Sequence, residues 1–497
     1  MSTVSLGAGP VRVRDIVGLA QGQAHAVPAP DLLDRLDTAR RALDRAAAGG
    51  ARIYGLNTGL GARVGRDLAE HPDGLDAAAF QTLLVRGRAV GMGDPLPAQV
   101  VRAAMAARLA MLSQGGSGIS PAVFTALAAL LDRAVHPRVP RHGSQGEGDL
   151  CLFAHVALVL IGEGEAEYRG NVLPGGRALR EAGLEPVLLG PKDGLSLVNA
   201  GAFSAGAGAL LAHEAARLLS WQEHATALSF AATCANRRVL EPAVQAARPA
   251  PGQVAAAERL RRLLAGSAWP AAGLQDPLSL RCAAPVLGAT AAAIDRAAQE
   301  VEIELNSAAD NPLVLVDTGE VLSTGNFACP AVALTFENLG LAMAQAAQAS
   351  LARFLQLTNG QRPGLPFGLS PVGGMAAGLV PLQKSAMALL AEIRRHAAPV
   401  MLDYWPVAAG VEDHATQAPL VVEKGEAILA SWRRLVAIEL LAAAQAIDLD
   451  GKDRLGPPLA ALHARLRRVV ASLQDDRPTG PDAERLAGWM EAVDASP

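Results

Sequence analysis

Residues 143–150 read Gly-Ser-Gln-Gly-Glu-Gly-Asp-Leu, and the interpretation of the whole chain starts from this short loop. Glu147 stands in its middle between Gly146 and Gly148, so that its carboxyl group can donate or accept a proton. In an apolar pocket the pKa of a carboxyl group rises, and the group can act as an acid near neutral pH. On a surface loop it would only be solvated. The segment therefore predicts either a catalytic carboxyl group or a glutamate without a function.

Five other parts of the chain carry short motifs of glycine and polar residues. They are Tyr54–Gly61, Leu197–Asn199, Gln275–Cys282, Asp310–Leu313 with Gly325–Phe327, and Glu412–His414. Together with residues 143–150, these motifs resemble those of the aromatic amino acid ammonia-lyases, which comprise histidine, phenylalanine and tyrosine lyases and related aminomutases. One motif alone is a weak signal, whereas six in the family's order indicate a resemblance over most of the chain.

The resemblance also exposes a difference at residues 143–150. In the family the loop reads Gly-Ser-x-Gly-Ala-Ser-Gly-Asp-Leu, and its Ala-Ser-Gly cyclises with loss of two waters into an electrophilic methylidene-imidazolone. Here the loop is one residue shorter, and the triad positions hold Gly146, Glu147 and Gly148. The serine hydroxyl that is eliminated in the family is missing. We therefore expect the lyase scaffold without this electrophile, and no cofactor.

Other departures lie among the positions that the family uses for catalysis. Leu278 replaces the tyrosine after Asp-Pro, Arg88 replaces the histidine of a Ser-His-Ala segment, and Val411 replaces a glutamine. The polar and aromatic residues that match the family are Tyr54, Asn199, Arg281, Phe327 and Glu412.

Composition bounds the class of protein. The 497 residues are 51% hydrophobic and 19% charged, which is enough to build a substantial core. The net charge of −4 offers no basic stripe for nucleic acid and no polybasic patch for a membrane. The ten histidines are scattered, so no metal site is expected. The four cysteines show no short-range pairing and no signal peptide is visible, which predicts reduced thiols in the cytoplasm.

Alanine-rich stretches with charges at three- and four-residue spacing predict long helices. They are Leu32–Ala48, Ala98–Ser113, Pro121–Ala134, Ala205–Thr233, Ala331–Leu357, Met375–Ala397 and Gly425–Leu449. Strands are expected only at Val11–Val13, Val187–Leu189, and in a hairpin of Leu313–Val316 with Val321–Ser323. The uncharged stretch Leu195–Leu211 predicts a buried core helix rather than a membrane span.

The predicted fold is therefore mainly α, with a long central helical bundle and few short strands, as in the ammonia-lyases. A boundary near Gly190–Gly194 divides it into an N-terminal mixed domain, residues 1–194, and a helical domain, residues 195–497. Residues 451–497 are expected to form a loosely attached end. The resemblance implies a homotetramer whose active sites are shared between subunits.

The candidate catalytic residues are Tyr54, Glu147 and Glu412. The resemblance implies that Tyr54 is a base, although a packing role is the alternative for a tyrosine with an ordinary pKa near ~10. Glu412 positions or accepts a proton, or it only pairs with His414. Asn57 is more simply read as a turn residue.

The candidate substrate-binding residues are Arg281, Asn199, Arg88, Phe327 and Leu278. Arg281 is expected to bind a carboxylate through its planar fork, the alternative being a structural ion pair. Arg88 supplies a second anion contact, or it is a solvated helix-end arginine. By the resemblance, Asn199 is a hydrogen-bond donor and Phe327 packs on the loop, whereas Leu278 makes one wall apolar.

These residues lead to one hypothesis and two alternatives. The hypothesis is a cofactor-independent enzyme of specialised metabolism that moves protons on a small carboxylate, by elimination of water, cyclising conjugate addition or isomerisation. One alternative is a catalytically silent relative that acts as a binding or scaffold protein. The other is an ammonia-lyase with an unusual electrophile, for which Gly143-Ser144-Gln145 supplies a serine.

Overall fold

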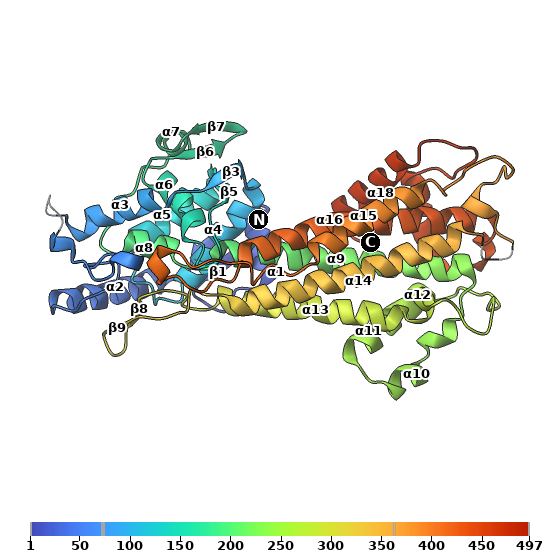
Figure 1. Ribbon diagram of the computed structural model, residues 1–497, viewed down its shortest axis with the longest axis horizontal. Helices are drawn as coiled ribbons and strands as arrows, with labels where there is room; N and C mark the ends of the chain where they lie inside the picture. Colours follow the sequence, from blue (N-terminus) through green and yellow to red (C-terminus); the bar gives the residue numbers. More distant parts are fainter. Residues whose placement is uncertain (1, 71–74, 361, 363, 496–497) are drawn as a thin grey trace. The chain divides into compact units, whose positions relative to one another are not determined.

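The chain folds as a mainly α protein, as predicted (Figure 1). This computed structural model describes residues 2–70, 75–360, 362 and 364–495. The helices are α1 Val13–Ala20, α2 Leu32–Ala48, α3 Ala77–Arg88, α4 Ala98–Leu112, α5 Pro121–Asp132, α6 Leu150–Leu160, α7 Gly175–Glu181, α8 Asp193–Val198, α9 Ala202–Thr233, α10 Pro242–Ala247, α11 Pro251–Leu263, α12 Leu278–Arg281, α13 Ala283–Leu305, α14 Pro330–Thr358, α15 Leu382–His396, α16 Ala418–Leu449, α17 Pro457–Val469 and α18 Gly480–Ala492. The strands are β1 Ser2–Leu6, β2 Ala24–Pro28, β3 Met92–Pro95, β4 His136–Pro137, β5 Pro140–His142, β6 Glu165–Tyr168, β7 Asn171–Pro174, β8 Leu313–Leu315 and β9 Glu320–Leu322.

Two compact units share the chain. Unit 1 is Met1–His213, Ala297–Phe336 and Pro399–Glu423, and unit 2 is Glu214–Arg296, Glu337–Ala398 and Lys424–Pro497. Each of α9, α13, α14 and α16 has residues in both units. The division predicted between residues 194 and 195 falls within α8 and inside unit 1. As a domain boundary it stays a prediction.

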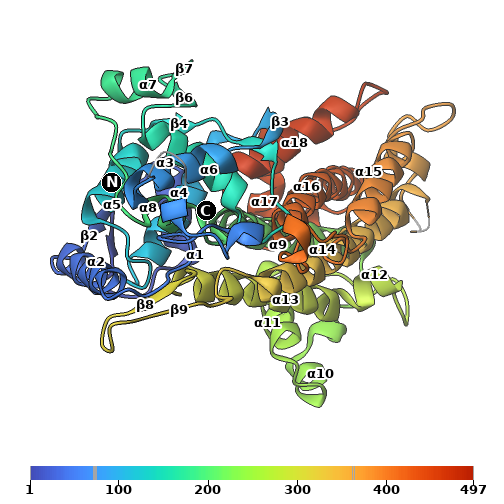
Figure 2. The same ribbon diagram turned by 60° about the vertical axis from the view of Figure 1, so that its left-hand side comes forward.

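In unit 1, the strands pair into short sheets of two or three strands. β1 pairs with β2 in parallel, β4, β6 and β7 form an antiparallel sheet, and β8 and β9 form the predicted hairpin. The hairpin lies along α2 (Figure 2), because Leu43 of α2 and Val314 of β8 share a buried apolar cluster with Ile53 and Leu56. This cluster supports the loop that carries Tyr54.

Two expected strands are absent from the structure. Val13 begins α1 instead, because the Asp15 carboxylate accepts the backbone N–H of Arg12 at 2.8 Å and closes the first turn. Val187 donates its N–H to the carbonyl of Leu160 at the end of α6, so residues 187–189 join no sheet. Both segments contain β-branched valine but are too short to form a strand without a partner.

In unit 2, the segments of α9, α14 and α16 lie side by side. Arg353 of α14 and Glu439 of α16 form a buried ion pair at 2.6 Å, and Ser229 of α9 donates to the same carboxylate at 2.7 Å. Both charged side chains are at most 1% exposed. A buried pair of this kind needs its remaining lone pairs satisfied, and the serine supplies one of the required donors.

The C-terminal region is not loosely attached, contrary to the expectation. In α17 and α18 the apolar residues Leu462, Leu466 and Leu486 are buried. The Trp489 ring lies 4.8 Å from that of Trp221, centroid to centroid. The proline-rich composition of this region concealed two amphipathic helices, whose prolines lie in the first turn where they are tolerated. The last two residues lie outside the described ranges.

Residues 193–233 are long and apolar enough to cross a membrane, judged by length and composition alone. Their most apolar window is entirely buried within the protein. This is the environment expected of a core helix, in line with the prediction for Leu195–Leu211.

Candidate functional site

The tyrosine loop, residues 53–61, follows α2 and presents a half-buried Tyr54. Ile53 and Leu56 fix the loop by packing into the apolar cluster described above. Asn57 closes the turn, accepting the N–H of Ile53 at 2.7 Å and donating to the carbonyl of Ala51 at 2.8 Å. It is therefore a turn residue, and Tyr54 is the side chain that the loop displays.

Hydrogen bonds fix Tyr54 and the loop that carries it. Its phenol oxygen accepts the backbone N–H of Gly61 at 3.0 Å. A buried glutamine of α3, Gln81, ties the loop to α8 by donating to the carbonyl of Gly55 at 2.9 Å and accepting the N–H of Leu195 at 3.0 Å. The position of Tyr54 is thus set by Gly61 within the loop, and by Gln81, which links the loop to α8.

Glu412 lies against the same glycine. A Cβ atom added to Gly61 would stand 3.5 Å from the Oε1 atom of Glu412, which places this carboxylate beside the residue that Tyr54 contacts. The ring of His414 packs edge-on against Tyr404, so its observed partner is this tyrosine, and the alternative pairing of Glu412 with His414 stays a prediction. The structure therefore brings two candidate catalytic residues, Tyr54 and Glu412, to one point.

The triad loop, residues 143–150, has a backbone that only glycine adopts readily at two positions. Gly146 and Gly148 have φ angles of 92° and 89°. A Cβ atom on Gly148 would stand 3.0 Å from Oδ1 of Asn199 and 3.2 Å from the ring of Phe327. The loop thus lies directly against these two predicted substrate-binding residues, and it leaves no room for a side chain at residue 148.

Asp149 anchors the triad loop to α9. Its carboxylate is buried and accepts the N–H and the hydroxyl of Ser204, each at 3.0 Å, and the hydroxyl of Ser144 at 3.2 Å. Burial raises the pKa of Asp149, and the bonds from Ser204 act in the opposite direction. Asp149 therefore has a structural role, fixing both ends of the loop to the start of α9.

Glu147 folds back onto its own loop. Its carboxylate accepts the side-chain amide of Gln145 at 3.0 Å and the backbone N–H of Gln145 at 3.2 Å. Burial raises the pKa of this carboxyl group, and the negative charge of Glu412 raises it further, whereas the backbone donors lower it. Glu147 is thus half-buried and hydrogen-bonded rather than merely solvated, and it lies within electrostatic reach of Glu412.

Cys151 and Arg88 complete this side of the site. Burial raises the pKa of the Cys151 thiol, the positive charge of Arg88 lowers it, and the charges of Glu147 and Glu412 raise it. Arg88 is half-buried in the last turn of α3, and its guanidinium has no hydrogen-bond partner among the residues that the structure describes. By contrast, its neighbour Arg86 forms an ion pair with Glu163. Arg88 is therefore the arginine that remains available for a substrate anion.

The residues at the triad positions do not fit a methylidene-imidazolone. An exocyclic methylene requires a side chain that loses a β-substituent, and Glu147 has none. The backbone of Gly146 lies against the side chain of Thr416, and the backbone of Gly148 lies against the side chain of Asn199. Ser144, the one serine of the loop, accepts the N–H of Gly146 at 2.9 Å and donates to Asp149. No catalytic step is therefore derived through this group.

Arg281 and Leu278 belong to α12 in unit 2. Arg281 donates to the side chain of Gln275 at 2.7 Å, and its Nε atom is buried without a hydrogen-bond partner among the described residues. Leu278 is 61% exposed. A free donor on a guanidinium agrees with the predicted carboxylate contact, which stays a prediction.

Sequence reasoning missed four residues that shape the site. Gln145 exchanges hydrogen bonds with the backbone of Trp405, and the hydroxyl of Thr416 donates to the carbonyl of Gly146 at 3.0 Å. The carbonyl of Gln145 also accepts the N–H of Gln417 at 2.6 Å. Gln145 was in view within the quoted loop, but nothing in the sequence indicated that residues 405–417 lie against it.

The fold and this grouping of residues define an aromatic amino acid lyase. The sequence pattern of the family described as aromatic amino acid lyase matches residues 11–468. The chain belongs to this family, and it is an enzyme of the lyase class.

Individual relatives narrow the comparison. A histidine ammonia-lyase of Anaeromyxobacter sp. (strain K) is 39% identical, over 99% of this chain and 99% of its own length. Among solved structures, the ergothioneine-degrading ergothionase of Treponema denticola is 30% identical, with a TM-score of 0.93 over 99% of each chain. The histidine ammonia-lyase of Trypanosoma cruzi is 28% identical, with a TM-score of 0.90 over 99% of this chain and 93% of that one.

These relatives correct the functional hypothesis. Full-length similarity to enzymes named histidine ammonia-lyase contradicts the expected proton-transfer enzyme for water elimination, cyclisation or isomerisation, and equally the silent scaffold. The expectation of specialised metabolism has no support among them. The hypothesis was wrong because it let one altered loop outweigh five motifs that match the family.

Proposed function

We propose that this protein is an ammonia-lyase that removes the α-amino group of histidine or of a close imidazole-bearing amino acid. The observation that carries the proposal is 39% identity to a histidine ammonia-lyase over 99% of both chains. The grouping of Tyr54, Glu412, Asn199 and Phe327 in unit 1 supports it, because these matched residues lie around two adjoining loops.

In this proposal Tyr54 is the base. It removes a proton from the β-carbon, the electrons of that bond form the double bond, and the C–N bond breaks to release ammonia. The N–H of Gly61, directed at the phenol oxygen, stabilises the phenolate form that accepts the proton. Glu412, beside Gly61, is placed to take the proton onward.

The remaining residues bind the substrate. Arg281 holds the α-carboxylate through its unpartnered donor, and Arg88 offers a second anion contact. Ionised Glu147 attracts the α-ammonium group, and Asn199 and Phe327 form the wall beside it. Leu278 adds an apolar surface.

Residues 146–148 do not fit the family's electrophile, so the activation of the amine as a leaving group needs a test of its own. Intact-protein mass spectrometry addresses it directly. A deficit of two waters that peptide mapping places within residues 143–149 would identify an electrophile made from another segment of the loop, Gly143-Ser144-Gln145.

A second candidate substrate is a histidine-derived betaine. The similarity to ergothionase, 30% identical over 99% of both chains, favours it. A quaternary ammonium group leaves as a neutral tertiary amine after the same removal of a β-proton, and it needs no electrophile. The same base and the same carboxylate contact would serve both substrates.

The protein is further proposed to be cytoplasmic and to work as a homotetramer with shared active sites. The family resemblance supports the tetramer, and exposed apolar residues on α14, Leu334 and Leu341, supply surface for subunit contacts. Light scattering of the purified protein measures the assembly.

The function is tested by incubating the full-length protein with histidine and following both ammonia and the ultraviolet absorbance of the conjugated acid. Phenylalanine, tyrosine and a histidine betaine are run in parallel. We expect product from histidine at a rate that depends on enzyme concentration and falls by about a hundredfold or more in Tyr54→Phe. Absence of any amine release from all four compounds would refute the proposal.

A further inference from the structure

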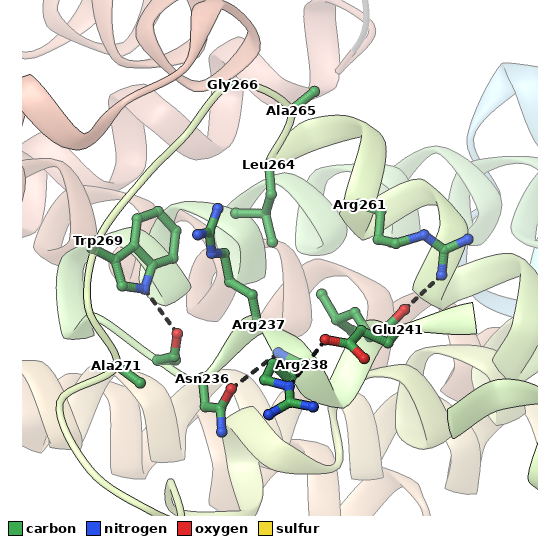
Figure 3. Close-up of a pocket in the computed structure, with 12 residues that line it drawn as sticks. Asn236, Arg237, Arg238, Glu241, Arg261, Leu264, Ala265, Gly266, Trp269 and Ala271 are labelled. Atoms are coloured by element: carbon green, nitrogen blue, oxygen red, sulfur yellow. Dashed lines mark hydrogen bonds and ion pairs between the residues drawn. The ribbon is translucent and has the colours of Figure 1, made fainter. Parts of the chain in front are cut away.

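A pocket lies wholly within unit 2, and none of the candidate catalytic residues lines it (Figure 3). It has a volume of about 570 Å³, which is within the ~300–1,000 Å³ range of small-molecule sites. Its walls come from the 3-10 helix η3, Arg237–Leu240, and from the segment that follows α11. The described residues that line it are Ala235, Asn236, Arg237, Arg238, Leu240, Glu241, Arg261, Leu264, Ala265, Gly266, Trp269 and Ala271.

The charge of this pocket is strongly positive. Three arginines, Arg237, Arg238 and Arg261, line it, and Glu241 is the one acidic residue among them. Arg238 is paired with Glu241 at 3.1 Å, and both side chains are largely exposed. Two positive charges are left in excess, so the pocket attracts an anion.

Two of the arginines are held in place by the backbone. Arg261 donates one N–H to the carbonyl of Leu240 at 2.6 Å, and Arg237 donates one to the carbonyl of Ser267. No other hydrogen bond of these two guanidinium groups is formed within the described part of the chain. Their remaining N–H groups are therefore preorganised donors of the kind that binds oxyanions in a bidentate way.

One wall of the pocket is apolar and rigid. Trp269 is buried, and its indole N–H donates to the carbonyl of Ala235 at 2.8 Å. The guanidinium of Arg237 lies 4.7 Å from the centre of the Trp269 ring. Figure 3 shows these two side chains next to each other, with Leu264 nearby. A ligand with an organic body can pack against this wall while its anion meets the arginines.

We propose that this pocket binds a small organic phosphate of about the size of a nucleoside monophosphate. A phosphate monoester carries ~1.5 to 2 negative charges at neutral pH, which matches the two excess positive charges of the pocket. Inorganic phosphate would satisfy the arginines but would leave most of the volume unfilled. The shape and charge together therefore select a phosphate attached to a larger group.

Ligand binding here acts on the segment that carries Arg281. The N–H of Asn236, a lining residue, donates to the carboxylate of Asp276 at 2.7 Å, and Arg281 donates to the adjacent Gln275 at 2.7 Å. Ordering of the pocket would thus order the Gln275–Cys282 motif. As a consequence that rests on the proposed function, the ligand should change KM for the amino acid more than kcat.

The test is isothermal titration calorimetry of the full-length protein with AMP at constant ionic strength. Inorganic phosphate, adenosine and citrate are the comparison ligands. We expect one AMP site per chain, much weaker binding of inorganic phosphate and citrate, and no binding of adenosine. Arg237→Gln and Arg261→Gln should each raise the Kd about tenfold or more, as expected for the loss of one charged contact.

Arg262→Gln is the matched control. Arg262 is the next residue of α11, pairs with Glu258 at 2.7 Å and does not line the pocket, so its loss should change the Kd less than twofold. Circular dichroism confirms that each variant is folded. Three results would overturn the proposal: no saturable AMP binding, equal affinity for citrate, or an equal effect of Arg262→Gln. None of these measurements depends on lyase activity.

Discussion

The tyrosine loop and the triad loop are supported in similar ways but have diverged very differently. Each is held by a buried polar side chain: Gln81 of α3 holds the first loop, and Asp149, which belongs to the second loop, holds it to Ser204 of α9. Each contains glycines with positive φ angles, among them Gly55 and Gly148. The tyrosine loop keeps the residue that the family uses, whereas the triad loop keeps its framework and has lost its reactive serine.

The difference shows that framework and chemistry can change independently. Asp149, Ser144 and Gly148 maintain the triad loop against Asn199 and Phe327 even though the residue between the glycines is now Glu147. The hydrogen bonds of Asp149 and Ser144 that hold the loop do not involve the side chain of residue 147. The predictions below therefore perturb either the chemistry or the framework of one loop.

Removing the phenol of the tyrosine loop should have the largest effect. Tyr54→Phe deletes the proposed base while keeping the ring, so turnover should fall by about 10²- to 10⁴-fold, or about 3 to 5 kcal/mol of transition-state stabilisation. The measurement is kcat for the amino acid that proves to be the substrate.

Tyr168→Phe serves as the control for this change. Tyr168 is a buried tyrosine of β6 outside the candidate site, so its variant should retain nearly full turnover. Activity of Tyr54→Phe within threefold of the unmodified protein would show that the two loops do not differ in the way described.

Breaking the framework of the tyrosine loop should cost somewhat less. Gln81→Ala leaves the carbonyl of Gly55 and the N–H of Leu195 buried without partners, at ~1–3 kcal/mol each. We expect a loss of about 2 to 4 kcal/mol in the free energy of unfolding, measured by denaturant titration. Gln114→Ala, which removes only bonds to Ala110 and Ser113 nearby in sequence, should lose less than half as much.

Much of the fold was predictable because long helices can be recognised from the periodic spacing of their apolar residues. The expected α2 has the observed bounds, Leu32–Ala48, since apolar residues recur at helical spacing and bury one face. By contrast, α15 begins at Leu382 rather than Met375. Gly373, Gly374 and Gly378 adopt positive φ angles before it, and composition alone does not reveal these angles.

The candidate site was predictable residue by residue but not as a geometry. Motifs singled out Tyr54 and Glu412, yet only the fold shows that both lie beside Gly61. Glu147 could be read as catalytic or solvated because its hydrogen bonds depend on Gln145, which is held in turn by Trp405. Contacts between segments so distant in sequence leave no local pattern.

A buried carboxyl group that is influenced by Asp149 of the triad loop, that of Glu304, should affect how the free energy of unfolding depends on pH. The pKa of Glu304 is raised to about 7 by burial, and the charges of Glu300 and Asp149 add to the effect. Because this pKa exceeds the ordinary value of 4.5, the folded protein binds more protons than the unfolded chain between these two pH values. The contribution of Glu304 to the free energy of unfolding therefore falls as the pH rises from 4.5 to 7, and levels off above.

Glu304→Gln removes this cost. At pH 8 the variant should be more stable than the unmodified protein by about 2 to 3 kcal/mol, and the gap should close as the pH falls toward 4.5. Glu302→Gln is the control, since Glu302 pairs with Arg12 at 2.7 Å and should gain nothing. A gap that stays constant with pH would contradict the shifted pKa of Glu304.

The smallest effect is expected at the altered residue of the triad loop. Glu147→Gln keeps the shape of the side chain but removes the charge proposed to hold the ammonium group, so kcat/KM should fall about tenfold, or about 1.4 kcal/mol. The pKa of Glu147 is raised, mainly by burial, so the unmodified enzyme should lose activity as the pH falls through a value above the ordinary one for glutamate. The variant should lack that acidic limb, because residue 147 no longer titrates. A pH–rate profile of kcat/KM for both proteins decides the matter. If the acidic limb persisted unchanged in Glu147→Gln, the triad loop would have lost its serine without gaining a functional carboxylate, and the contrast with the tyrosine loop would be one of decay.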